Sequence, residues 1–236
     1  MTDGIKALAF DIGGTVFDWQ TPIRAEIDAR AKKLGVPVNS QAFAFDWRKS
    51  MFALLAEVRS GDLPWMNVDE IHRRGLNRLR EDYHRLAFSD EDLDELNRVW
   101  HRLQPWPDFP AALARLREKY TAIVLTVLSW SVAIDCSRTS NLCWDGILSC
   151  EFLGHYKPDP EVYWAGARLL GLDPKEVMMV ASHGADLRAA MNAGMATAYV
   201  APRLQEPDFP GFKEASPEEF TMSVDNFTAL ADALCD

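Results

Sequence analysis

Cysteine is scarce in this sequence of 236 residues, and the few that occur are not arranged for metal or disulfide chemistry. No two of them form a CxxC pair, as their positions show: Cys136, Cys143, Cys150 and Cys235. A low count without paired spacing excludes a disulfide-stapled scaffold and a zinc module built on cysteine ligands. It is typical of a protein of the reducing cytoplasm, which is the location that we expect.

Long hydrophobic runs and an excess of positive charge are also missing. No segment approaches the roughly 20 consecutive apolar residues of a membrane-spanning helix, and the first residues do not show a basic region followed by an apolar one. The formal net charge of −10 argues against nucleic acid as a partner. We therefore expect neither a membrane nor a nucleic acid, and an anionic small-molecule substrate needs a locally positive pocket.

What the sequence does contain is an alternation of apolar runs and helix patterns. Short apolar, often β-branched runs predict strands over residues 5–10, 122–127, 146–152, 176–181 and 196–200. Helix patterns lie over residues 109–120, 129–139 and 225–234. One further helix is expected to begin at Pro160 and another to end at Gly194, and a loop-rich segment covers 202–217. Nearly unbroken apolar strands are typical of a parallel sheet that is buried on both faces, so we predict an α/β fold.

The middle of the chain differs, because its apolar residues recur at helical spacing. This spacing predicts helices over residues 21–34, 40–59, 68–86 and 89–103, with Thr21 and Ser89 as N-caps. We therefore place an all-helical insertion at residues 19–105, within an α/β core formed by residues 1–18 and 106–236. The tryptophan-rich apolar faces of the insertion fit either a homodimer interface or a buried core.

One arginine of the insertion lies on an apolar face of its helix. Arg48 is spaced to lie among Phe45, Phe52 and Leu55, on a helix that is apolar on a second side as well. An unpaired buried charge costs several kcal/mol, so a buried Arg48 needs an anionic partner. The alternative is that its guanidinium reaches water at the edge of this face.

The segment around Asp11 is the strongest candidate for a reactive site. Asp11 follows the first predicted strand and precedes Gly13, Gly14 and Thr15. In open parallel sheets, ligands bind beyond the carboxyl ends of the strands. The glycines let the backbone turn sharply and approach a ligand, and Thr15 adds a hydroxyl. The alternative is an aspartate that only caps a turn.

Other polar residues also follow predicted strands. Thr126 lies at the end of the strand over residues 122–127, although a threonine is common at such a position. The strand over residues 176–181 is followed by Ser182, His183 and Asp186. Asp186 could also be an ordinary acidic residue in the first turn of a helix.

A Lys-Pro-Asp-Pro run at residues 157–160 holds a lysine on a loop directly before a helix. Asp159 is expected to be the N-cap and Pro160 the first helical residue, which makes the loop that carries Lys157 rigid. Tyr163 follows in the early turns of the same helix. Its alternative interpretation is ordinary aromatic packing in the core.

Taken in order, these residues resemble the four motifs of the haloacid dehalogenase superfamily. The matching residues are Asp11-x-x-Gly14-Thr15, Thr126, Lys157-Pro-x-Pro and Asp186. With the helical insertion, they resemble the L-2-haloacid dehalogenase (type II) branch over essentially the whole chain. The resemblance implies a Rossmann-like parallel-sheet core with an inserted helical cap domain. It also implies a hydrolase that acts on the carbon–halide bonds of short 2-haloalkanoic acids.

The resemblance further implies a role for each matching residue. Asp11 would be a covalent nucleophile that forms an aspartyl ester, and Arg48 would receive the departing halide. Water activated or ordered by Asp186, with Ser182 and His183, would then hydrolyse the ester. The residues implied at the substrate are Thr15, Thr126, Val127, Lys157, Tyr163 and the N–H groups near Ile12 and Gly13. This scheme uses no metal ion and no organic cofactor.

Several positions depart from the patterns of the superfamily. Its magnesium-dependent phosphatases carry carboxylates where this chain has Gly13 and Ser182, which favours the dehalogenase branch. Many dehalogenases carry asparagine where this chain has Val127 and His183, and a bulkier residue at Ala185. Three alternatives therefore stay open: a phosphatase, a hydrolase of another small carboxylate, and a non-catalytic protein that binds small acids.

Overall fold

The computed structural model describes residues 3–206 and 215–236, so half of the predicted loop at 202–217 lies outside the described residues. Its main sheet has six strands in the order β5-β4-β1-β6-β7-β8, and all pairings in it are parallel. The strands are β1 (Ala7–Phe10), β4 (Thr121–Thr126), β5 (Gly146–Ser149), β6 (Val177–Ala181), β7 (Ala196–Val200) and β8 (Met222–Val224). The predicted α/β fold with a parallel sheet is therefore confirmed.

The central strands of the sheet bring the predicted site residues to one edge. Strand β1 is completely buried and pairs with β4 on one side and β6 on the other. Phe10, its last residue, is opposite Val124 of β4 and Val180 of β6. The carboxyl ends of these three strands therefore meet at one edge, where the strand order reverses and open α/β sheets bind ligands.

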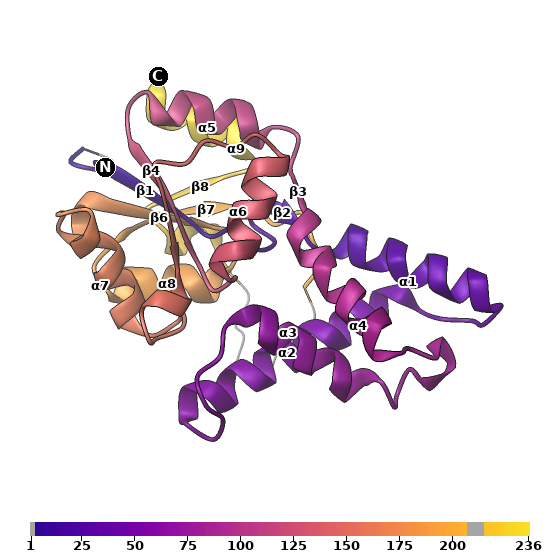
Figure 1. Cartoon of the computed structure of the whole chain (residues 1–236). Helices are drawn as coiled ribbons and strands as arrows, with labels where there is room; N and C mark the ends of the chain where they lie inside the picture. Colours follow the sequence, from indigo (N-terminus) through magenta and orange to yellow (C-terminus); the bar gives the residue numbers. More distant parts are fainter. Residues whose placement is uncertain (1–2, 207–214) are drawn as a thin grey trace.

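Helices cover the sheet on both sides. Helices α5 (Phe109–Arg117) and α9 (Phe227–Cys235) pack together on one side, and α7 (Pro160–Leu169) and α8 (Gly184–Asn192) lie on the other (Figure 1). Helix α6 (Trp130–Thr139) follows β4 and contacts β5. Because both faces are covered, the strands can be apolar on both faces, which is the pattern that the sequence shows.

The segment between β2 and β3 is helical and lies beside the carboxyl edge of the sheet (Figure 1). It contains α1 (Gln20–Leu34), α2 (Ser40–Ser60), α3 (Val68–Leu79) and α4 (Asp90–Asn97), with 3₁₀ turns at His84–Leu86 and Arg98–Arg102. Strands β2 (Phe17–Asp18) and β3 (Gln104–Pro105) pair antiparallel where the chain enters and leaves this segment. We propose that this ribbon marks the boundary between a core domain and a cap domain.

Several local predictions were wrong in detail. Helix α1 begins at Gln20, so Thr21 is not its N-cap; the Asp18 carboxylate instead accepts the N–H groups of Gln20 at 3.0 Å and Thr21 at 3.1 Å. Asp159 is the N-cap residue of α7, but its side chain does not cap that helix, and it forms an ion pair with Arg59 of α2. The Asp159 carboxylate has a partner on another helix within reach, which spacing alone does not reveal.

The predicted helices at 68–86 and 89–103 are each shorter than expected. Helix α3 ends at Leu79, where the chain turns back so that α4 packs against α3, and α4 ends at Asn97, where the 3₁₀ turn at Arg98–Arg102 begins. The predicted N-cap Ser89 is confirmed, and it forms a capping box with Asp92.

The tryptophans of the helical segment are largely accounted for by its own core. Trp19, Trp47 and Trp100 are fully buried, and Trp19 stacks on Trp100 at 6.0 Å between ring centroids. Trp65 is more exposed and stacks on Tyr156. Homodimer formation stays a prediction. Within the described ranges, every helix is too short or too polar to span a membrane.

Candidate active site

Asp11 lies one residue beyond β1, at the carboxyl edge of the sheet. Its backbone N–H donates to the carbonyl of Val180 in β6 at 3.0 Å, which fixes the residue against the neighbouring strand. The side chain is buried, with 6% of the residue exposed. Gly14 has φ +90°, a conformation that favours glycine, and the resulting turn brings the Thr15 hydroxyl to 2.7 Å from Asp11 Oδ2.

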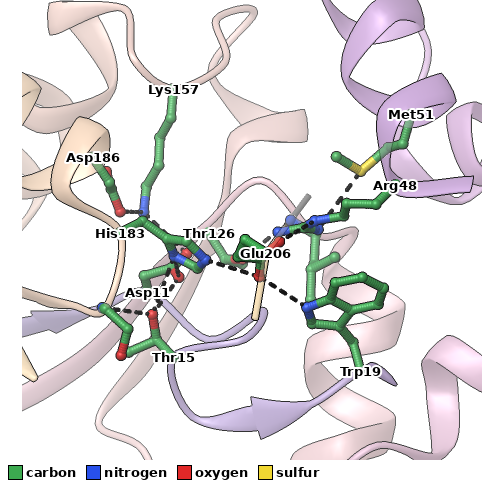
Figure 2. A network of polar contacts seen from close by, with 12 residues as sticks. Asp11, Thr15, Trp19, Arg48, Met51, Thr126, Lys157, His183, Asp186 and Glu206 are labelled. Carbon is green, nitrogen blue, oxygen red and sulfur yellow. Dashed lines mark hydrogen bonds and ion pairs between the residues drawn. The ribbon is translucent and has the colours of Figure 1, made fainter. Parts of the chain in front are cut away.

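Lys157 bridges two buried carboxyl groups from the loop before α7 (Figure 2). Its Nζ lies 2.7 Å from Asp186 Oδ2 and 3.4 Å from Asp11 Oδ1. The Tyr163 hydroxyl donates to the other oxygen of Asp186 at 2.6 Å. Both oxygens of Asp186 are therefore engaged, and Tyr163 reaches the site through this carboxylate.

The second oxygen of Asp11 is held from the opposite direction. Oδ2 accepts the Thr15 hydroxyl, and His183 Nδ1 lies 3.1 Å from the same oxygen. The backbone N–H of Ser182 donates to Thr15 Oγ1 at 3.0 Å, which directs the proton of that hydroxyl toward Asp11. Thus Oδ2 has two close donors, whereas Oδ1 faces Lys157.

Glu206 is a site residue that sequence reasoning missed. Its Oε1 accepts the indole N–H of Trp19 at 3.1 Å and lies 3.4 Å from His183 Nε2, while Oε2 lies 3.7 Å from Arg48 Nε. Figure 2 shows it between His183 on one side and Arg48 and Trp19 on the other. The need of a buried Arg48 for an anion was the one signal that pointed to such a residue.

Arg48 has the buried setting that its sequence pattern predicts. It is 4% exposed, and its guanidinium carbon lies 4.8 Å from the ring centroid of Phe52 and 5.1 Å from that of Trp19. Its Nη1 also approaches the Met51 sulfur at 3.9 Å. The alternative in which the guanidinium reaches water is wrong, because Trp19, Phe52 and Glu206 enclose it.

The remaining predicted residues lie at the ends of β1 and β4. Thr126 is the last residue of β4, and its buried Oγ1 accepts the backbone N–H of Leu128 at 3.1 Å. Val127 follows it and is half-buried. Ile12 is completely buried, and Gly13 forms a bridge with Phe17. The contacts of these residues with a substrate stay predictions.

The charges of the two bridged carboxyl groups are unequal. Burial favours the neutral form of Asp11, but the charge of Lys157 and the hydrogen bond from His183 outweigh it and hold the pKa of Asp11 well below its usual range. Burial and repulsion by Asp11 raise the pKa of Asp186, against the pull of Lys157. Burial alone would lower the pKa of Lys157, but the two carboxylates raise it. Asp11 is therefore the stronger acid of the two carboxyl groups.

The His183–Glu206 pair is charged on both sides. Burial opposes the charge of His183, yet hydrogen bonds to Asp11 and Glu206 raise its pKa to about 10. Burial likewise opposes the charge of Glu206, but Arg48 and His183 lower its pKa to about 2. The three carboxyl groups of the site thus face three basic groups, and an entering anion meets no net negative charge.

The donor set of this site does not suit a divalent cation. Such a cation prefers several oxygen anions, and Gly13 and Ser182 supply no carboxylate. Asp11 and Asp186 already share the ammonium group of Lys157, which a cation would have to displace. Among the described residues, no group of three or more histidine, cysteine, aspartate or glutamate side chains is arranged to hold a metal ion.

Comparisons with known proteins agree with this fold. A buried aspartate after the first strand of a parallel sheet, a lysine before a later helix and a helical insertion define a class of hydrolases. A model of that class, the haloacid dehalogenase-like hydrolases, matches residues 5–194, and the chain belongs to this family.

Three relatives illustrate the similarity. The (S)-2-haloacid dehalogenase 4A of Burkholderia cepacia is 26% identical over 218 residues, which cover 89% of this chain and 88% of the relative. The crystal structure of the L-2-haloacid dehalogenase PA0810 is 33% identical, with a TM-score of 0.88 and 98% of both chains covered. That of the defluorinating L-2-haloacid dehalogenase Rha0230 is 32% identical, with a TM-score of 0.87 over 98% of this chain and 96% of the other.

Proposed function

We propose that this protein is a hydrolytic dehalogenase of short 2-haloalkanoic acids that works through an aspartyl ester on Asp11. One observation carries the proposal: Asp11 is a buried carboxylate that is kept ionised by Lys157 and His183 at the ligand-binding edge of the sheet. The similarity to proteins named as (S)-2- and L-2-haloacid dehalogenases supplies the substrate class.

In the first step, Asp11 Oδ1 attacks the carbon that bears the halogen. A carbon–oxygen bond forms, the carbon–halogen bond breaks, and the halide leaves with its electron pair without needing a proton. The absence of a carboxylic acid at Gly13 is compatible with this step, because no leaving oxygen has to be protonated.

Arg48 receives the departing halide in this scheme. Its guanidinium is enclosed by Trp19 and Phe52, and a fixed cation in apolar surroundings stabilises developing negative charge without reorganisation. Glu206 lies nearest Nε, and a guanidinium carries five N–H donors, so one side chain can pair with Glu206 and still contact a halide.

The substrate carboxylate binds at the ends of β1 and β4. Lys157, the Thr126 hydroxyl and the N–H groups near Ile12 and Gly13 hold it, with Val127 and Tyr163 beside them. The balanced charge of the site supports this placement, because Lys157 and Arg48 offset Asp11 and Asp186. Orientation of the substrate by these groups sets the halogen-bearing carbon in line with Asp11.

In the second step, water hydrolyses the ester at the carboxyl carbon of Asp11. Asp186 activates this water, which Ser182 and His183 help to order, and the raised pKa of Asp186 makes it a better proton acceptor than an ordinary aspartate. The step needs neither a metal ion nor an organic cofactor.

The test is halide release from L- and D-2-chloropropionate, bromoacetate and fluoroacetate in excess EDTA. Fluoroacetate belongs in the panel because one relative is a defluorinating enzyme. We expect release that survives chelation and falls to background in Asp11→Asn, which keeps the size of the side chain and removes the nucleophile. The substrate ranking then defines stereochemistry and pocket size.

No release from any haloacid would contradict the proposal. A phosphoester screen with Mg²⁺ would then separate a phosphatase from a protein that only binds small acids. Release that EDTA abolishes and Mg²⁺ restores would contradict the metal-independent mechanism.

A further inference from the structure

The two oxygens of Asp11 are not equivalent, and this difference assigns them different parts in the reaction. Oδ2 accepts the Thr15 hydroxyl at 2.7 Å and faces His183 Nδ1 at 3.1 Å, whereas Oδ1 lies 3.4 Å from Lys157 Nζ. An oxygen with two close donors has its lone pairs engaged. Oδ1 is therefore the oxygen that attacks, and Oδ2 becomes the carbonyl oxygen of the ester.

Both ring nitrogens of His183 face carboxylate oxygens. Nδ1 is directed at Asp11 and Nε2 at Glu206, 3.4 Å away. A carboxylate oxygen can only accept, so each nitrogen carries a proton and the imidazole is the positively charged form. The charged groups around it are Asp11 and Glu206, with Arg48 behind Glu206, and Thr15 adds its hydroxyl at 3.4 Å.

We propose that Thr15 and His183 form the oxyanion hole for hydrolysis of the aspartyl ester, and that Glu206 is the residue that positions His183. This inference rests on the proposed function, and it assigns to Glu206 and His183 a task in the second step. His183 is a catalytic residue because it touches Oδ2, and Glu206 acts through it.

The hydrolysis step then balances as follows. The oxygen of water bonds to the carboxyl carbon of Asp11, and negative charge develops on Oδ2, where the Thr15 hydroxyl and the His183 Nδ1–H already donate. The bond from that carbon to Oδ1 breaks, and the departing alkoxide takes one proton of the water. The second proton is released when Asp11 ionises again. Donors that are already in place stabilise the intermediate without reorganisation.

The packing around Gly14 explains why this arrangement is fixed. A Cβ atom at Gly14 would lie 3.2 Å from Glu206 Oε1 and 3.3 Å from the His183 ring, so the two side chains rest directly on the glycine. On its other side Glu206 is held by Trp19 and Arg48 of the helical segment. The position of His183 over Asp11 therefore depends on contacts from both the sheet and the helices.

The experiment separates the two chemical steps. Rapid-quench assays with L-2-chloropropionate measure halide release, and mass spectrometry of the intact protein measures the ester on Asp11. In His183→Gln we expect hydrolysis to slow about 100- to 1,000-fold, the range for loss of one oxyanion-hole donor, with ester formation changed far less. Halide then appears as a burst of one equivalent, and the ester accumulates.

Glu206→Gln provides the second variant, since it keeps the shape of the side chain and removes its charge. We expect slower hydrolysis of the ester and a shift of the alkaline limb of the hydrolysis rate to lower pH, because His183 loses one of its two carboxylates. The matched control is Glu57→Gln on the outer surface of α2, where the carboxylate pairs with Arg78. It should leave both steps and the pH profile unchanged.

The outcomes distinguish the inference from the proposed function. Equal slowing of ester formation and hydrolysis in both variants, without accumulation of the ester, would overturn the oxyanion-hole assignment. An unchanged pH profile in Glu206→Gln would overturn the positioning role of Glu206. No halide and no ester from the unaltered protein would instead overturn the proposed function itself.

Discussion

Two histidines of this protein each lie between two carboxylates, in very different surroundings. His183 lies between Asp11 and Glu206 at the carboxyl edge of the sheet. His101, in the 3₁₀ turn at Arg98–Arg102, has Nδ1 at 2.7 Å from Asp135 and Nε2 at 3.3 Å from Asp69. We call the first group, with Lys157 and Asp186, the site cluster, and the group of His101, Asp69 and Asp135 the hinge cluster.

Each cluster holds one histidine between two carboxylates, and the clusters differ in the groups that surround these three residues. In the hinge cluster, Asp69 of α3 also accepts the hydroxyls of Ser129, the N-cap of α6, and Ser131 in the first turn of α6, so the group ties the helical segment to the core. In the site cluster, one carboxylate also faces a buried lysine and a ligand-binding edge. If Asp11 is the nucleophile that we propose, a histidine between two carboxylates is structural in one cluster and catalytic in the other because of what its partners do.

The largest effect is expected when the site cluster loses the ammonium group that its two carboxylates share. Lys157→Met leaves Asp11 and Asp186 buried without their shared partner, so we expect a loss of about 3–5 kcal/mol in the free energy of unfolding, as for other broken buried pairs. Urea unfolding measures it, with Lys175→Met as the matched control on an exposed lysine. A loss similar to that of the control would mean that the cluster is not held by charge.

A smaller loss is expected from the glycine under His183. Gly14→Ala combines a positive φ with tight contacts to Glu206 and His183, and we expect a cost of about 1–3 kcal/mol together with impaired hydrolysis. Gly61→Ala is the matched control, because Gly61 has φ +83° and an added Cβ would meet no atom within 4 Å. Equal activity of the two variants would argue against the packing of His183 on Gly14.

The hinge cluster should make the free energy of unfolding depend on pH. Hydrogen bonds to Asp69 and Asp135 raise the pKa of His101 in the folded protein, although burial opposes them. The stability that His101 contributes to the folded protein is therefore fully present below the pKa of the histidine in the unfolded chain, about 6.5. It is lost as pH rises through the pKa of His101 in the folded protein.

We expect the free energies of unfolding of the unaltered protein and His101→Gln to differ by about 1 kcal/mol at low pH, since the group is partly solvated. That difference should shrink at alkaline pH, while halide release stays unchanged. A difference that grows with pH would have the wrong sign for a histidine held by carboxylates.

The smallest effect is expected for an ion pair that also joins helices and core but is more exposed. Arg59 of α2 pairs with Asp159 at the start of α7. Because solvent screens such pairs, Arg59→Gln should change stability by no more than about 1 kcal/mol and leave halide release intact. Arg48→Gln should, by contrast, impair halide release, because its guanidinium is buried in the site. Similar kinetics for both variants would remove the distinction between the two arginines.

The sequence predicts the parts of the site that follow strands. Asp11, Thr126 and Asp186 come after apolar runs, and strands of a parallel sheet end at one edge, but each had a structural alternative until the four-motif resemblance grouped them. Lys157 was added because its Lys-Pro-x-Pro run resembles the third motif of the family, and the prolines predicted only that its loop is rigid. The apolar and helical patterns gave the α/β fold and the helical insertion.

Glu206 could not be found in this way, because no periodicity or motif marks the loop after β7. It lies 187 positions from Trp19, and only the tertiary fold brings them together. The ribbon of β2 and β3 was missed for a related reason, since strands of two residues carry no alternation to detect. The oxygens of Asp11 were distinguished only by distances.

The central claim is that Asp11, rather than water, displaces the halide. It is tested most directly by a single turnover of L-2-chloropropionate, with the protein in excess, in water enriched in the heavy oxygen isotope and containing EDTA. The account predicts that the isotope enters the carboxyl group of Asp11, read by peptide mass spectrometry, and that the first hydroxyacid formed is unlabelled. A labelled hydroxyacid with unlabelled Asp11 would show that water attacks the substrate directly, and would contradict the account.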